Sequence, residues 1–189
     1  MRVCAFILVP LLLAACGGSP RTDFHTLVPV PAGQPTHGPA EAGSPIEVGR
    51  VDLPGILDRQ WLVTRGPGTS IEVSDQHRWA APLDELIRRA LTADLRDRLG
   101  DSEVLAPGDP PPPGGARTLA LNVQQFSGDS AGQVMLKADW IIGGPGPGRP
   151  AQAHHVDLRL DAGSANPDAV TAAMSQAVGK LADAIAAQV

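Results

Sequence analysis

The sequence predicts an α+β fold: a single domain in which a largely antiparallel sheet carries two helices on one face. The predicted elements follow the order three strands, one helix, four strands and a final helix, without the regular strand and helix alternation that builds parallel sheets. Each helical segment is apolar along one stripe only, which is typical of a helix that covers a sheet. With 189 residues and 43% hydrophobic content, the chain has the size of one globular domain with tails.

The N-terminus has the pattern of an export signal. Arg2 is a short basic region, and the apolar run that follows it is shorter than the roughly 20 residues that span a bilayer. Leu-Ala-Ala directly before Cys16 resembles the bacterial lipoprotein box. We therefore expect residues 1–15 to be a signal peptide, the Cys16 sulfur to form a thioether to diacylglycerol and the Cys16 amine to be acylated. Cleavage of an ordinary secretory signal after Ala15 is the alternative.

Cys16 is thus expected to be a lipid anchor and not a thiol. Cys4 leaves with the signal, so the mature chain keeps one cysteine and cannot form an internal disulfide. Each buried methylene contributes about 0.8 kcal/mol, so two or three acyl chains hold a protein on its membrane permanently. Position 17 is Gly and not Asp, and the sorting rule known for many such lipoproteins then implies the outer membrane, facing the periplasm.

The tether is predicted over residues 16–22 and the folded domain over 23–189, with a Pro/Gly-rich loop at 29–45. We expect residues 24–30 to dock on the domain as a short strand. Alternation that shifts phase at Gly49 and Arg50 predicts a bulged strand. Strands are predicted over 46–53, 61–64, 70–73, 104–105, 119–123, 134–140 and 156–160.

Turn and helix signals separate these strands. The runs at 61–64 and 70–73 flank Gly66-Pro67-Gly68, which predicts a hairpin. The last three runs form an antiparallel meander with one polar face, joined by residues 127–132 and 143–150. The first helix is predicted from Pro82 to its stop at Gly100, with acidic residues in its first turn and Arg96 and Arg98 in its last. The second opens with Asn166 as N-cap and Pro167 in its first turn.

Composition and motifs argue against several functions. The net charge is −5 and the charges are mixed along the chain, so no basic stripe is present for nucleic acid. Adjacent His154 and His155 in a strand point to opposite faces and cannot readily bind one metal. No nucleophile motif or phosphate-binding glycine loop is present in the sequence. We expect a protein that is not an enzyme and has no cofactor or metal.

Two stretches carry a family resemblance: VDLPGILDRQWLVTR, and HRWAAPLDELIRRALTADL after a short gap. They resemble the ABC-type transport auxiliary lipoprotein family, whose members show Leu-Pro, Leu-Asp-Arg, a strand ending in Arg, and Arg-Trp-Ala-Glu-Pro-Leu at a helix start. Ile56 replaces a common aromatic, and Ala81 replaces the usual Glu, which argues against carboxylate chemistry there. The matching positions are Leu53, Pro54, Leu57, Asp58, Arg59, Arg65, Arg78, Trp79, Pro82 and Leu83.

The resemblance implies an auxiliary subunit, anchored in the envelope by its lipid, that works with an MCE-domain protein and an ABC transporter. Such a system moves phospholipid or other hydrophobic cargo, and the lipoprotein is a docking or bridging part at the outer membrane and forms a homo-oligomer. The alternative is a free-standing envelope lipoprotein that binds cell wall or stabilises another assembly.

One local hypothesis follows from the motif residues themselves. Asp58 and Arg59 could form a polar cluster with Arg65 and Arg78 beside Trp79, because guanidinium groups stack favourably on indole rings. We expect this cluster to be a structural lock that fixes the hairpin to the first helix.

Overall fold

The computed structural model describes residues 21–32, 44–106, 108–144 and 152–189. Several expected features lie wholly or mostly outside these ranges: the signal peptide 1–15, Cys16, the tether 16–22, the loop 29–45 and the turn 143–150. The elements in chain order are β1 Asp23–His25, β2 Ile46–Asp52, β3 Trp61–Arg65, β4 Ile71–Trp79, α1 Leu83–Leu99, β5 Val104–Leu105, β6 Arg117–Asp129, β7 Gln133–Gly143, β8 Ala153–Asp161 and α2 Pro167–Ala186.

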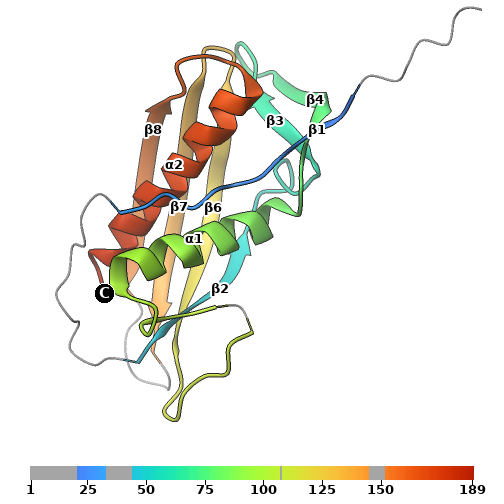
Figure 1. Cartoon of the computed structure of the whole chain (residues 1–189). Helices are drawn as coiled ribbons and strands as arrows, with labels where there is room; N and C mark the ends of the chain where they lie inside the picture. Colours follow the sequence, from blue (N-terminus) through green and yellow to red (C-terminus); the bar gives the residue numbers. More distant parts are fainter. Residues whose placement is uncertain (1–20, 33–43, 107, 145–151) are drawn as a thin grey trace, which may run out of the picture.

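All described strands join one curled, mixed sheet (Figure 1). The long strand β6 is its centre: β7 and then β8 pair with one edge in an antiparallel meander, while β2 and β3 pair in parallel with the other edge. β4 pairs antiparallel with β3 and continues the sheet to β1. The antiparallel ladders β6–β7 and β7–β8 are the longest. The predicted α+β class and the single domain are confirmed.

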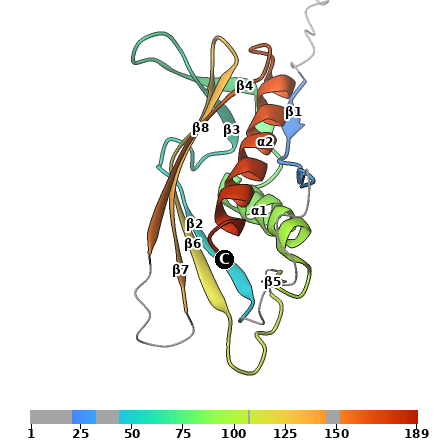
Figure 2. The same cartoon turned by 90° about the vertical axis from the view of Figure 1, so that its left-hand side faces the viewer.

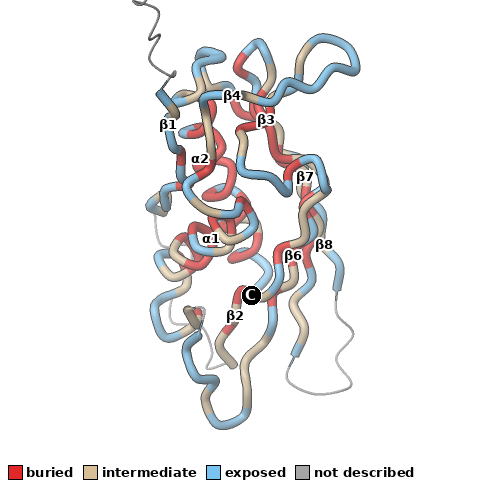
Figure 3. The backbone as a smooth tube through the Cα atoms, turned by 90° about the vertical axis from the view of Figure 1, so that its right-hand side faces the viewer, coloured by how far each residue is buried: buried red, intermediate tan, exposed pale blue. Residues whose placement is uncertain are grey.

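Both helices cover the same face of the sheet, as predicted (Figure 2). α2 packs over β6, β7 and β8, and α1 packs over β2 and β5 and against α2. Figure 3 shows that the buried segments gather between the helices and the sheet. The core is mainly aliphatic, and its largest fully buried side chains include Phe126, Leu91, Leu136, Met174 and Ile185. Apolar burial of this kind is the main favourable term in folding.

The N-terminal segment docks on the domain, as expected, but only part of it is a strand. β1 pairs in parallel with the end of β4. The chain then crosses both helices on the side away from the sheet (Figure 1). There the Val28 amide donates to Ser175 Oγ (3.1 Å), the Val30 amide to Asp94 Oδ1 (2.6 Å) and the Ala32 amide to Asp97 Oδ2 (2.6 Å). We call residues 26–32 the N-terminal strap.

Other details of the prediction need correction. Counting β1, four strands precede α1 and not three. β4 runs to Trp79, well beyond the predicted end at residue 73, because pairing with β1 and β3 extends it. Pro82 is the N-cap of α1 and not a residue of its first turn, and its carbonyl accepts from the Leu86 amide (3.0 Å). The predicted bulge in β2 is confirmed, since its register with β6 shifts between Val48 and Val51.

Candidate functional site

The first motif residues form a tight turn directly after β2. The carbonyl of Pro54 accepts from the Leu57 amide (2.8 Å) and from the Asp58 amide (3.3 Å). This turn directs the Leu57 side chain inward, where it is 5% exposed, while Asp58 and Arg59 stay exposed. The Leu-Pro and Leu-Asp-Arg motifs therefore form the turn that follows β2, reverses the chain and buries Leu57.

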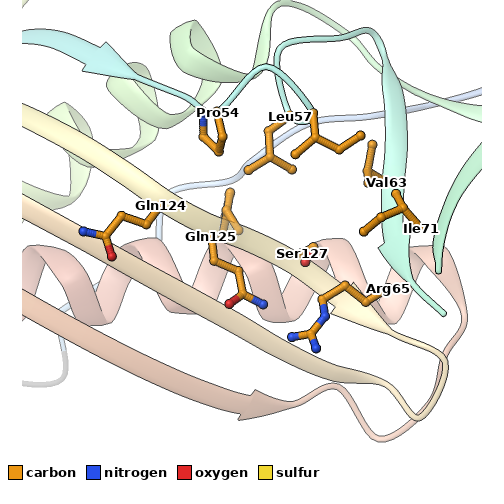
Figure 4. Close-up of a pocket in the computed structure, with 10 residues that line it drawn as sticks. Pro54, Leu57, Val63, Arg65, Ile71, Gln124, Gln125 and Ser127 are labelled. Carbon is orange, nitrogen blue, oxygen red and sulfur yellow. The ribbon is translucent and has the colours of Figure 1, made fainter. Parts of the chain in front are cut away.

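The turn closes one side of a pocket on the sheet (Figure 4). β6 pairs with β2 up to Asn122 and with β3 from Gly128 onward, so in the described chain no strand covers this edge of β6 between those positions. The pocket occupies that interval and has a volume of about 330 Å³. Its lining residues are Pro54, Ile56, Leu57, Val63, Arg65, Ile71, Gln124, Gln125, Phe126 and Ser127.

The pocket opens on the face of the sheet opposite the helices. A Cβ on Gly128 would meet the Val170 side chain of α2, so residue 128 faces the helices and its neighbour Ser127 faces away from them. Figure 4 agrees, because α2 lies behind the strands that carry the labelled side chains. Ile56 and Ile71 at the pocket are 40% and 47% exposed. These two large apolar side chains form an exposed apolar rim.

Polar groups gather on the β6 side of the pocket. Arg65 Nη1 donates to Met135 Sδ (3.5 Å), and the Gln125 side-chain amide donates to the same sulfur (3.6 Å). Within the described ranges no carboxylate lies within 4 Å of the Arg65 guanidinium nitrogens. Ser127 is 5% exposed, and its hydroxyl has no hydrogen-bond partner in the described chain. The pocket thus combines an apolar wall with a cation that has no carboxylate partner and a hydroxyl that has no acceptor among the described residues.

The second half of the motif shapes the corner between β4 and α1. The Arg78 guanidinium lies over the Trp61 ring at 5.0 Å from its centroid. Trp79 is 4% exposed, and its backbone amide donates to the Gln60 carbonyl (2.7 Å). Leu83 is buried at the start of α1. These residues act as packing and stacking elements that fix the corner.

The expected polar cluster does not form. Asp58 makes no hydrogen bond or ion pair with Arg59, Arg65 or Arg78, all of which the structure describes. Arg78 stacks on Trp61 and not on Trp79, because Trp79 points into the core while Trp61 lies opposite Arg78 across the β3–β4 pairing. The Arg78–Trp61 contact therefore joins the two strands of the hairpin to each other, and the expected polar lock between the hairpin and α1 is absent from the described residues.

A histidine cluster joins β1, β4 and α2. His25 Nε2 and His77 Nδ1 share a hydrogen bond (3.0 Å), and His25 Nδ1 lies 3.5 Å from Asp168 Oδ1 and 3.4 Å from the Thr171 hydroxyl. Burial lowers the pKa of His25, and the neighbouring His77 lowers it further, against the opposing carboxylates of Asp168 and Asp23. His25 is therefore neutral near neutral pH, and its contacts with His77 and Thr171 join the start of the N-terminal strap to β4 and α2.

Two buried charges hold the strap to the helices. Arg98 is 4% exposed and donates to Asp183 Oδ1 (2.6 Å) and to the carbonyls of Val30 (3.2 Å), Asp94 (2.8 Å) and Gly179 (3.0 Å). Asp94 is 1% exposed, and its Oδ2 has no partner within the described chain. Burial raises the pKa of Asp94 to about 6, even though the Val30 amide and Arg98 lower it.

His154 and His155, which are adjacent in β8, lie as the strand alternation predicts. His154 stacks on Trp140, with ring centroids 5.3 Å apart, while His155 Nδ1 lies 2.6 Å from Asp139 Oδ1. In the described residues no group of His, Cys, Asp and Glu side chains is placed to hold a metal ion. Over the same ranges, no helix combines the length and the apolar character that crossing a membrane requires.

Sequence reasoning missed the β6 half of the pocket. Gln124, Gln125 and Ser127 line the site, but neither the predicted strand at 119–123 nor the predicted turn at 127–132 gave them a role in a pocket. One signal was present: two consecutive glutamines interrupt the alternation, and the register with β7 shifts between Val123 and Gln125. No local sequence pattern indicates that the distant 53–59 turn lies beside β6 at this pocket.

The chain belongs to the ABC-type transport auxiliary lipoprotein component family, whose model it matches over residues 25–186. It is similar to the intermembrane transport lipoprotein PqiC of Escherichia coli (strain K12) and to that of Shigella flexneri. Each is 28% identical over 135 residues, which are 70% of this chain and 69% of the relative.

Solved structures share the fold. A crystal structure of an uncharacterised protein has a TM-score of 0.74 at 19% identity and covers 89% of this chain and 99% of its own. A crystal structure of a Xanthomonas campestris protein has a TM-score of 0.71 at 16% identity, with 87% and 93% covered. The predicted family is confirmed, and a family of transport auxiliary lipoproteins is not a known class of enzyme.

Proposed function

We propose that this protein is the lipid-anchored periplasmic subunit of an MCE and ABC-type transport system and docks or bridges that system at the outer membrane. The observation that carries the proposal is family membership over almost the entire folded domain. Similarity to proteins named intermembrane transport lipoprotein supports an envelope system for phospholipid or other hydrophobic cargo. Further partners are the ABC transporter components and a second copy of this chain in a homo-oligomer.

The docked N-terminus supports a position close to the membrane. β1 begins at Asp23 and the strap that follows is bonded to both helices, so the chain between Cys16 and β1 is the only spacer. At about 3.3 Å per residue a seven-residue tether spans about 23 Å at most. Acylation at Cys16 then holds the domain near the bilayer surface. The helices and the strap lie on one face of the sheet, and the pocket opens on the opposite face (Figure 2 and Figure 4).

Capture from detergent-solubilised envelope tests the partnership. A full-length chain with a C-terminal tag should retain an MCE-domain protein and ABC transporter components. Recovery of only peptidoglycan fragments or assembly factors would overturn the proposal and favour a free-standing envelope lipoprotein.

The anchor has its own test. Mass spectrometry of the native protein should show an acylated Cys16 at the N-terminus, and the wild-type protein should sediment with outer-membrane vesicles. Cys16→Ser should abolish both the acylation and the sedimentation. An unmodified Cys16 on protein released freely by cell lysis would contradict the proposal.

A further inference from the structure

The pocket between the 53–59 turn and β6 has two sides of different chemistry. The wall is aliphatic, built by Pro54, Ile56, Leu57, Val63 and Ile71. The opposite side carries the Arg65 guanidinium, the Gln125 amide and the Ser127 hydroxyl. A ligand that satisfies both sides must be apolar over most of its length and must carry hydrogen-bond acceptors at one end.

The polar side lacks an anion. Arg65 is exposed, its guanidinium donates only to a thioether sulfur, which is a weak acceptor, and no carboxylate forms an ion pair with it within the described chain. Asp129 lies opposite Arg65 in the β3–β6 pairing, but its Oδ1 accepts from the Ala131 and Gln133 amides (both 2.9 Å) and it does not pair with Arg65. A guanidinium beside a pocket, with open donors, matches a carboxylate or phosphate group.

Ser127 points to the same kind of ligand independently. The residue is 5% exposed, and its hydroxyl borders the pocket, has no hydrogen-bond partner in the described structure and is reached by solvent from the pocket. A ligand that fills the pocket excludes this solvent, so it must bring an oxygen acceptor for the hydroxyl or leave the hydroxyl unsatisfied. The neighbouring Gln124 is different, because its amide already donates to Asp139 Oδ2.

We propose that this pocket binds a single-chain anionic amphiphile, with the head group at Arg65 and Ser127 and the hydrocarbon chain against Ile56, Leu57 and Ile71. Fatty acids and lysophospholipids share this chemistry. At about 30 Å³ per water-sized group, the volume accommodates about ten non-hydrogen atoms. A hydrocarbon chain fits the aliphatic wall because it needs no hydrogen-bond partners, whereas a peptide would place an N–H and a C=O per residue against it.

The proposal that the pocket binds an amphiphile is argued from the pocket residues, and only the identification of that amphiphile with envelope lipid rests on the proposed function. Experiments can therefore refute amphiphile binding and the transport function separately. Loss of partner capture with intact amphiphile binding would refute the transport assignment alone. Absence of amphiphile binding with intact capture would refute this proposal alone.

The test uses the mature chain from residue 16 with Cys16→Ser, which keeps every described residue and needs no detergent. Octanoate and octyl phosphate are titrated by calorimetry and by NMR of the Gln125 and Ser127 amides, with 1-octanol, octylammonium and acetate as matched probes. We expect one or both anionic amphiphiles to bind more tightly than each of the three controls, with shifts at both amides. The anionic amphiphile that binds more tightly shows whether the preferred head group is a carboxylate or a phosphate.

Variants separate the two sides of the pocket. Arg65→Gln should weaken the anionic amphiphiles by about fivefold to tenfold and leave 1-octanol unchanged. Ile56→Ser should weaken the anionic amphiphiles and 1-octanol alike by about fivefold. The matched control Arg59→Gln changes an exposed motif arginine outside the pocket and should have no effect.

Three outcomes would overturn the proposal. The first is no binding of either anionic amphiphile, or binding that Arg65→Gln leaves unaltered. The second is dissociation of an oligomer by Ile56→Ser without any amphiphile binding, which would assign the pocket to a second copy of the chain. The third is binding of 1-octanol as tightly as both anionic amphiphiles, which would show that the pocket does not recognise an anionic head group.

Discussion

Asp94→Asn should change how the stability of this protein depends on pH. The Asp94 carboxylate is buried between α1 and the N-terminal strap, accepts the Val30 amide through Oδ1 and leaves Oδ2 without a partner. Asparagine keeps the acceptor oxygen and removes the charge. The comparison of the two proteins across pH therefore isolates the cost of ionising one buried acid.

The magnitude follows from the pKa. Burial raises the pKa of Asp94 to about 6, against about 4 in an unfolded chain. The folded state then binds the proton more tightly, so the wild-type protein is stabilised by this group at low pH and loses that stability as the pH rises from about 4 to about 6. Two pKa units correspond to about 3 kcal/mol. The free energy of unfolding of wild type relative to Asp94→Asn should fall by up to about 3 kcal/mol between pH 4 and pH 7.

Urea unfolding at a series of pH values measures this difference. Asp97→Asn is the matched control, because Asp97 also accepts a strap amide but is exposed. Asp97→Asn should leave the pH dependence of the free energy of unfolding close to that of wild type, whereas Asp94→Asn should reduce it. Parallel stability curves for wild type and Asp94→Asn between pH 4 and pH 7 would refute the reasoning, since they would show that Asp94 ionises without a burial penalty.

Three further changes test the strap and the helix packing. His25→Gln should remove a loss of stability that wild type shows in urea unfolding as the pH falls below about 6.5, because the pKa of folded His25 is lowered. Gly179→Ala would place a Cβ 2.9 Å from Val30 Cβ, so hydrogen exchange of the strap should accelerate, and Val30→Gly should partly restore its protection. Gly128→Ala would place a Cβ 2.6 Å from Val170 Cγ1 and should cost about 1–3 kcal/mol by thermal unfolding, with partial rescue by Val170→Ala.

In α1, apolar periodicity predicts the buried apolar residues correctly but does not predict the buried charged ones. Ile87, Leu91 and Leu95 lie on the predicted apolar stripe of α1 and are buried. Asp94 and Arg98 are also buried, although neither belongs to the apolar stripe and Arg98 was predicted only as a basic residue of the last turn. The reason is that the strap covers this side of the helix and its backbone groups bond to both charges. A segment that returns from more than sixty residues away leaves no trace in the local pattern of α1.

The sequence by itself determined which segments become strands and helices, the bulge in β2, the N-cap Asn166 and the family motif, because local backbone preferences and apolar periodicity govern each of them. Only the tertiary structure decided what the motif builds. β2 and β3 pair with different parts of β6 and leave an interval between Asn122 and Gly128, and the turn after β2 closes over it. The registers of these non-local pairings depend on burial across the whole sheet, so Arg65 and Ser127 meet at one pocket for a reason that no short stretch of the chain contains.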